Sequence, residues 1–264
     1  MSSAPVTAAT APDSVPADVG APRTSPPPRS WERALVAGSL ITQLMIVLDM
    51  TIIAVALPRM QADLGLTSSQ RPWAITAYTL ANGGLVLLGG RLTTVIGIRR
   101  SYWLGQAGFA AASLIAGTAT SFPVLVTART AQGAFAALLG PTTLSLLNSA
   151  FPAGPRRRRV FALFGATGGV GAAAGLLIGG ALTDWLSWRW SLYVNVPIAL
   201  IGFLVGLRGL PASSPRRDGP ALPDLPGLVL GCAACFSAVF GLDRAEQTSW
   251  GSASTIGWLA AAVV

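Results

Sequence analysis

The stretch FPVLVTARTAQGAFAALLGPTTLSLLNSAF, from Phe122 to Phe151, is apolar throughout except for one charged residue, Arg129. It exceeds the ~20 residues that a helix needs to cross a bilayer. A guanidinium cannot lose its proton, and its burial in a bilayer core costs at least ~2.5–3.5 kcal/mol. Gln132 and Gly133 follow within the next turn. Because membrane proteins that keep such a charge usually use it, the stretch predicts a polar site inside a bundle of membrane helices.

The composition supports the same class of protein. The chain has 264 residues, of which 52% are hydrophobic and 11% charged, and its mean hydropathy is +0.59. A soluble domain carries about a quarter charged residues. The net charge of +8 does not indicate nucleic-acid binding, because the arginines lie at the ends of apolar runs. Histidine is absent, and no acidic metal cluster or nucleophile motif is present, so we expect no enzyme, no cofactor and no metal site.

Seven apolar segments are long enough to span a membrane, and an eighth begins near Thr255 and is still apolar at Val264. The sequence therefore predicts an all-α, polytopic bundle with six spans in residues 31–210. Residues 1–30, rich in Ser, Ala, Pro and Thr, are expected to be a disordered cytoplasmic tail. Residues 211–225 are expected to be a cytoplasmic linker, and residues 226–264 to hold two additional spans, the eighth incomplete. The seven segments are 34–57, 73–93, 101–121, 123–148, 160–183, 190–208 and 226–242.

The arginines also predict the orientation. Thirteen of them fall on the side of the N-terminal tail and four on the opposite side, and cytoplasmic loops are the ones enriched in basic residues. We therefore expect the N-terminus in the cytoplasm. The run Arg156–Arg159 lies between two spans, so it is interpreted as a topology determinant that contacts anionic lipid headgroups rather than nucleic acid.

Two charges lie well inside the spans, and they fall at similar depth. Asp49 is about 12–14 Å from the outer end of the first span, and Arg129 is about 9 Å into the fourth, at 1.5 Å per helical residue. A carboxylate and a guanidinium at one level can neutralise each other. The pair has two interpretations: a carboxyl group that takes up and releases a proton beside a fixed positive charge, or a static pair that fixes helix register.

Small residues mark the fifth and seventh spans. Gly171, Gly175 and Gly179 recur every four residues and form a smooth stripe on one helix face. Such stripes allow close backbone approach in lipid, either as static packing or as a contact that slides during a transport cycle. Cys232 and Cys235 form a C-x-x-C pair inside an apolar segment, where they are interpreted as small packing residues.

Five segments, taken together and in order, resemble the signature segments of the major facilitator superfamily. The closest likeness is to its drug:proton antiporters with fourteen spans, and it covers residues 32–264, the N-terminal portion of such a protein. The segments are LDMTIIAVALP (48–58), GGRLTTVIGIRR (89–100), ARTAQGAFAALLGPTTLSLL (128–147), GAAAGLLIGGAL (171–182) and SWRWSLYVNVP (187–197).

The resemblance implies a bacterial-type plasma-membrane protein that exchanges protons for small hydrophobic or cationic compounds. Transport would occur by alternating access between two six-helix halves, with the site near the midplane. The family's first-span acid falls on Asp49 and its fourth-span arginine, linked to proton coupling, on Arg129. The residues expected in conformational change or gating are Gln132, Gly133, Gly90, Gly97, Arg99, Arg100, Gly171, Gly175, Gly179 and Gly180.

The chain departs from the family pattern in three places. Thr94 stands where the cytoplasmic turn normally has an acid, and Leu176 where the fifth-span motif usually has proline. The second six-helix half is absent, which leaves a fragment, a truncated product, or a half that pairs with another chain. The alternative function is therefore a remnant half-transporter without transport activity of its own, or a half that needs a partner chain. The substrate is not encoded in these motifs.

Overall fold

The computed structural model describes residues 30–210 and 225–263. Within these ranges all regular secondary structure is helical, which confirms the expected all-α class. Each expected span coincides with a helix or a pair of helices. The helices are α1 (Ser30–Leu64), α2 (Trp73–Ile96), α3 (Ile98–Gly117), α4 (Phe122–Ala150), α5 (Pro155–Trp185), α6 (Trp190–Tyr193), α7 (Asn195–Gly209), α8 (Leu225–Gln247) and α9 (Ala253–Ala261).

Among the described helices, six segments are long and apolar enough to cross a membrane: α1, α2, α4, α5, Trp190–Gly209 and Pro226–Ala245. The expected third span, α3, falls outside this set because Arg99, Arg100 and Gln106 lower its hydropathy. The sixth span is divided between α6 and α7. Pro197 has no N–H to donate to the carbonyl of Tyr193, so the helical ladder is interrupted there.

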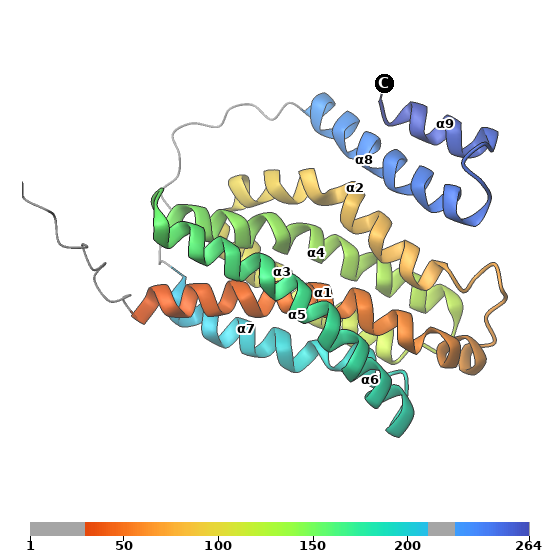
Figure 1. Cartoon of the computed structure of the whole chain (residues 1–264), viewed down its shortest axis with the longest axis horizontal. Helices are drawn as coiled ribbons and strands as arrows, with labels where there is room; N and C mark the ends of the chain where they lie inside the picture. The colour runs from red at the N-terminus through yellow and green to blue at the C-terminus, as the bar shows by residue number, and fades with distance from the viewer. Residues whose placement is uncertain (1–29, 211–224, 264) are drawn as a thin grey trace, which may run out of the picture.

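Successive long helices run in opposite directions through one bundle (Figure 1). The helix α1 is central: it packs against α5, α7 and α4, while α2 packs along α4, and α3 fits between α4 and α7. The α8–α9 hairpin lies against α2, on the outside of the bundle (Figure 1). The tail and the linker expected at 1–30 and 211–225 lie outside the described residues, apart from Ser30 and Leu225.

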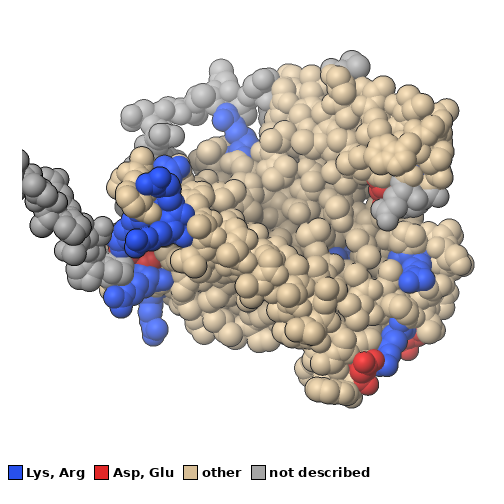
Figure 2. Space-filling view, viewed as in Figure 1, with Lys and Arg blue, Asp and Glu red and all other residues tan. Residues whose placement is uncertain are grey.

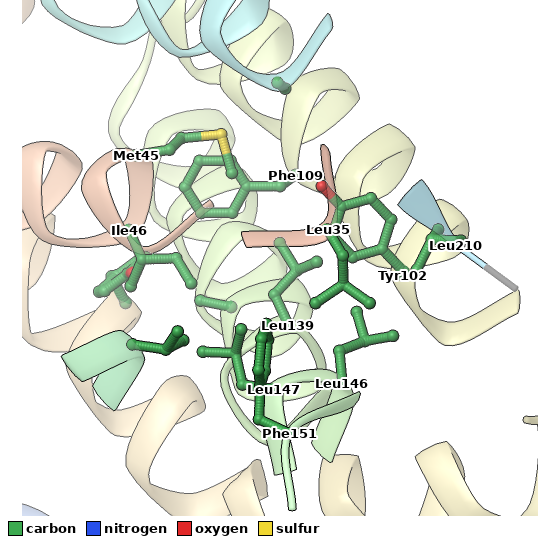
Figure 3. Packing of buried hydrophobic residues seen from close by; sticks show 14 residues of the cluster. Leu35, Met45, Ile46, Tyr102, Phe109, Leu139, Leu146, Leu147, Phe151 and Leu210 are labelled. Atoms are coloured by element: carbon green, nitrogen blue, oxygen red, sulfur yellow. The ribbon is translucent and has the colours of Figure 1, made fainter. Parts of the chain in front are cut away.

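The buried apolar residues form two clusters along the bundle. One surrounds Met60, Leu125 and Leu192 near the start of α4. The other, shown in Figure 3, includes Met45, Phe109 and Leu139 and extends to the opposite end. The polar centre described below lies between these clusters along α1.

The two ends of the bundle differ in charge (Figure 2). The basic end is where α1, α3 and α5 begin and α2, α4 and α7 finish; it carries Arg33, Arg91, Arg99, Arg100, Arg156–Arg159 and Arg208. The mixed end carries the exposed ion pairs Arg59–Asp184 and Arg189–Asp63. This separation along the helix axes is the arrangement from which the orientation was predicted.

The turn at the basic end between α2 and α3 requires one glycine. Gly97 has φ +91°, a conformation that L side chains rarely adopt. The tight turn brings Arg99 and Arg100 into the first helical turn of α3.

The cysteine pair lies in α8, where both side chains are free and half-buried. No group of three potential His, Cys, Asp or Glu ligands is found in residues 30–210 and 225–263.

Candidate functional site

Asp49 and Arg129 meet in the middle of the bundle. Nη1 of Arg129 lies 2.6 Å from Oδ2 of Asp49, and both side chains are 0% exposed. Asp49 comes from α1 and Arg129 from α4, which run antiparallel, so equal depth from the mixed end brings them together. Charges buried to this degree are tolerated only when they are paired and hydrogen-bonded.

Amide side chains complete the carboxylate's shell. Oδ1 of Asp49 accepts from Nδ2 of Asn195 on α7 at 2.6 Å and from Nε2 of Gln132 on α4 at 3.2 Å. Gln132 also accepts from Nη1 of Arg129 at 3.0 Å and donates to Oγ of Ser113 on α3 at 2.8 Å. Four helices therefore contribute to one fully buried polar network, which we call the Asp49 centre.

Arg129 also ties this centre to α2. Its Nε donates to the carbonyl oxygen of Ala74 at 2.9 Å, and its guanidinium lies 4.5 Å from the centroid of the Tyr78 ring. Its Nη2 atom and the Tyr78 hydroxyl have no hydrogen-bond partner among the described residues. The Arg129 guanidinium therefore connects the Asp49 carboxylate on α1 to the backbone of α2.

Of the two charges in the centre, only a carboxylate charge can be removed by a proton. Asp49 can take a proton and become neutral, whereas Arg129 keeps its charge. A neutral carboxyl group no longer compensates a guanidinium that is shielded from water, so the protonated state favours a rearrangement that gives Arg129 other acceptors.

Gly133 permits the close approach of α4 and α2 beside this centre. A Cβ at Gly133 would overlap the carbonyl oxygen of Tyr78 and lie 2.9 Å from Cβ of Ala81. The same pair of helices touches again at Gly89, where a Cβ would overlap the carbonyl oxygen of Ala137. Gly90 lies next to this contact, and a Cβ there would lie 3.7 Å from Cβ of Pro141.

The expected stripe on α5 lies against α1 over the stretch that carries Asp49. A Cβ at Gly175 would meet Oγ1 of Thr51 and would lie 2.9 Å from the carbonyl oxygen of Leu48. Gly171 and Gly179 make the same kind of approach one turn away on either side. Gly180 does not belong to this contact, because a Cβ there would meet nothing within 4 Å.

The remaining expected gating residues lie at the basic end, away from the Asp49 centre. Gly97 forms the turn, Arg99 is half-buried and Arg100 is exposed. Thr94, which replaces the family's acid, is exposed and donates to the carbonyl of Arg91 at 2.7 Å. The hydroxyl therefore closes a local turn and provides no negative charge for an arginine.

Sequence reasoning missed three contributors to the centre: Asn195, Ser113 and the Ala74 carbonyl. Asn195 carried a signal, since it is the one amide in the apolar run from Trp190 to Leu207. Ser113 and Ala74 carried none, because small residues on a membrane helix are common on every face.

Comparison with known proteins agrees with the motifs. The family model described as Major Facilitator Superfamily matches residues 39–264. The puromycin resistance protein pur8 of Streptomyces alboniger is 48% identical over 227 residues, 86% of this chain and 44% of that protein. The cephamycin export protein CmcT of Amycolatopsis lactamdurans is 41% identical over 210 residues, 80% and 43% of the two chains. The multidrug resistance protein Stp of Mycobacterium tuberculosis (strain CDC 1551 / Oshkosh) is 32% identical over 220 residues, 83% and 41%.

The chain thus spans less than half the length of these curated relatives. Its helical architecture, its several apolar helices and the match over most of its residues agree with one another. The chain belongs to the major facilitator superfamily of membrane transporters.

Proposed function

We propose that this chain is a transporter that exports small hydrophobic or cationic compounds in exchange for protons by alternating access. The observation that carries the proposal is the fully buried Asp49–Arg129 pair, which joins α1 to α4 and, through Ala74, to α2. In this proposal the charged and the neutral form of the Asp49 carboxyl group favour different helix packings, as an alternating-access cycle requires.

In the transport cycle that we propose, one proton binds to Asp49 and is released again during each cycle. In the deprotonated state the carboxylate holds Arg129, Gln132 and Asn195, and so fixes α1, α4 and α7 to one another. Protonation cancels the charge of Asp49 and weakens this set of contacts. Arg129 then depends more on its contacts with α2, and the equilibrium between the two helix packings shifts. Loss of the proton restores the first packing.

The orientation that we propose places the basic end in the cytoplasm, in keeping with the excess of arginine there. The choice of test compound follows from a relative that is named for puromycin resistance. Puromycin, an organic cation with aromatic groups, is therefore the first compound to test, with ethidium as a second cation of different shape.

A vesicle assay tests the function. The purified chain, reconstituted in liposomes, is expected to move puromycin against its gradient when a pH gradient is imposed, and to stop when a protonophore collapses that gradient. Movement that is indifferent to the pH gradient would contradict proton coupling.

A second candidate is a half that transports only when a partner supplies the other six helices. The broad exposed apolar face of α5 favours it, because Leu163, Val170, Leu176 and Leu177 on this face are 53–77% exposed. Co-expression with the C-terminal half of the pur8 relative distinguishes the two candidates: only the second predicts that export begins on co-expression.

A further inference from the structure

A second buried polar cluster lies on α1, α3 and α7, three of the four helices that form the Asp49 centre. Nε2 of Gln106 on α3 donates to Oγ1 of Thr42 on α1 at 2.6 Å and lies 3.2 Å from the hydroxyl of Tyr102. That hydroxyl donates to the carbonyl oxygen of Gly202 on α7 at 2.9 Å. The side chains of Thr42 and Gln106 are 0% exposed and that of Tyr102 is 1% exposed. We call these residues the Gln106 cluster.

The two polar groups are in register on all three helices. Thr42 precedes Asp49 by seven residues on α1, Gln106 precedes Ser113 by seven on α3, and Asn195 precedes Gly202 by seven on α7. Seven residues are close to two helical turns, so each pair shares one helix face and is separated by about 10.5 Å along the axis. The Gln106 cluster is on the basic-end side of Asp49.

A thin apolar layer separates them. Met45 on α1 and Phe109 on α3, both 0% exposed, occupy the turn between the two polar levels, with Ala199 of α7 beside them. Figure 3 shows Met45 lying against the ring of Phe109. The methionine side chain is unbranched and flexible, so this layer can change shape at low cost.

Both polar levels contain atoms suited to hold water. Oε1 of Gln106, Oγ of Ser39 and Oγ of Ser101 are buried without a partner in the described part of the chain, as is Oδ1 of Asn195 above them. Buried polar atoms of this kind are normally satisfied by ordered water. Ser101 is in the first turn of α3, about 5 Å from the helix start at the basic end, so the unpartnered atoms extend almost to that surface.

We propose that protons enter and leave Asp49 from the basic end through the interior of α1, α3 and α7, by way of the Gln106 cluster, with the Met45–Phe109 layer as the gate. The step is a transfer along hydrogen-bonded water: a proton arrives on the Asp49 carboxylate, which becomes a neutral carboxyl group, and Arg129 remains protonated throughout. The inference rests on the proposed function, since it supplies the route to the proton carrier proposed there. The charged and titratable side chains that face Asp49 are Arg129 from α4 and Tyr78 from α2; α3 and α7 present Ser113 and Asn195, and α5 presents glycine.

The test measures how fast Asp49 is protonated. The chain is reconstituted in liposomes, and the infrared band of the protonated carboxyl group, identified by its absence in Asp49→Asn, is followed after a rapid pH jump on one side. The combined variant Thr42→Val and Gln106→Leu is expected to slow protonation from the basic end by about tenfold or more, equivalent to a barrier raised by ~1.4 kcal/mol. Phe109→Ala, which opens the layer, is expected to accelerate it.

Thr143→Val is the matched control. Thr143 is also 0% exposed and also donates to the carbonyl four residues before it, as Thr42 does, but it lies on α4 outside the proposed route. It is expected to leave the rate within about twofold of the unaltered chain, since it removes no atom of the route. A folding defect would change the rate in one direction in all variants, whereas the route requires the Thr42→Val, Gln106→Leu variant to slow protonation and Phe109→Ala to accelerate it.

The outcomes separate the two proposals. If the carboxyl band responds to pH at the same rate in the unaltered chain and in the Thr42→Val, Gln106→Leu variant, the proposed route is wrong. The assignment of Asp49 as the proton carrier is then unaffected. A band that responds only to a jump at the mixed end also overturns the route. Absence of any Asp49 band as the pH is lowered contradicts Asp49 as the carrier, and with it both proposals.

Discussion

Asp49→Asn is expected to lower the free energy of unfolding by about 3–5 kcal/mol, because it leaves the Arg129 guanidinium buried without its counter-charge. Arg129→Leu is expected to cost less, since the remaining Asp49 carboxylate can take a proton and become neutral, which a guanidinium cannot do. Unfolding in mixed detergent micelles measures both differences. The asymmetry between the two single variants is specific to a pair with one removable charge.

A variant that carries both substitutions completes a double-mutant cycle. Asp49→Asn with Arg129→Leu removes the whole ion pair, and replacement of a buried pair by uncharged residues is often close to neutral. The loss of stability in the double variant should therefore be well below the sum of the two single losses. Strictly additive losses would show that the two charges do not stabilise each other.

An exposed pair on the same chain provides the comparison. Arg59 and Asp184 are 2.6 Å apart at the mixed end, with 52% and 65% of their side-chain surface exposed. Such pairs contribute about 0.2–1 kcal/mol. Asp184→Asn should therefore have a far smaller effect than Asp49→Asn, although the two ion pairs have the same length.

Gly133→Ala is expected to destabilise the bundle by about 1–3 kcal/mol, because the added methyl group has no free volume. It would overlap the backbone carbonyl of Tyr78, which can move only if α2 moves away from α4. That movement would also lengthen the contacts of Arg129 with Ala74 and Tyr78, so proton-coupled transport should fall together with stability.

Gly140→Ala is the control for this substitution. Gly140 lies on the same helix, and a Cβ there would meet nothing within 4 Å. Alanine is up to about 1 kcal/mol more favourable than glycine in a helix interior, so this variant should be neutral or slightly more stable. Equal effects of the two substitutions in thermal unfolding would contradict the close α2–α4 contact.

The pairing of Asp49 with Arg129 could be anticipated because both helices rise by the same amount per residue. Counting residues from the outer ends of the first and fourth spans therefore predicts the depth of each charge without knowledge of how the helices pack. The glycine stripe on α5 was also readable, since its period of four residues defines one face. What the stripe contacts was not readable, because a smooth face fits any helix of suitable shape.

The amide contacts around Asp49 illustrate what the sequence could not predict. Asn195 stands out in the sequence as the one amide in its apolar run, but its contact with Asp49 depends on how α7 packs against α1 and α3, which no local pattern reports. The position of the α8–α9 hairpin against α2 depends in the same way on distant surfaces, including the hydrogen bond from Thr76 to Asp243 at 2.7 Å. Periodicity predicts the helices, but their rotations and partners follow from packing over the whole bundle.

The most direct test of the central claim compares two modes of transport by Asp49→Asn in liposomes. Exchange of labelled for unlabelled puromycin at equal pH requires no net proton movement, whereas accumulation driven by a pH gradient does. The account predicts that Asp49→Asn abolishes gradient-driven accumulation, since asparagine cannot carry a proton, while exchange continues at a measurable rate. Full gradient-driven accumulation by Asp49→Asn would contradict the assignment of Asp49 as the proton carrier.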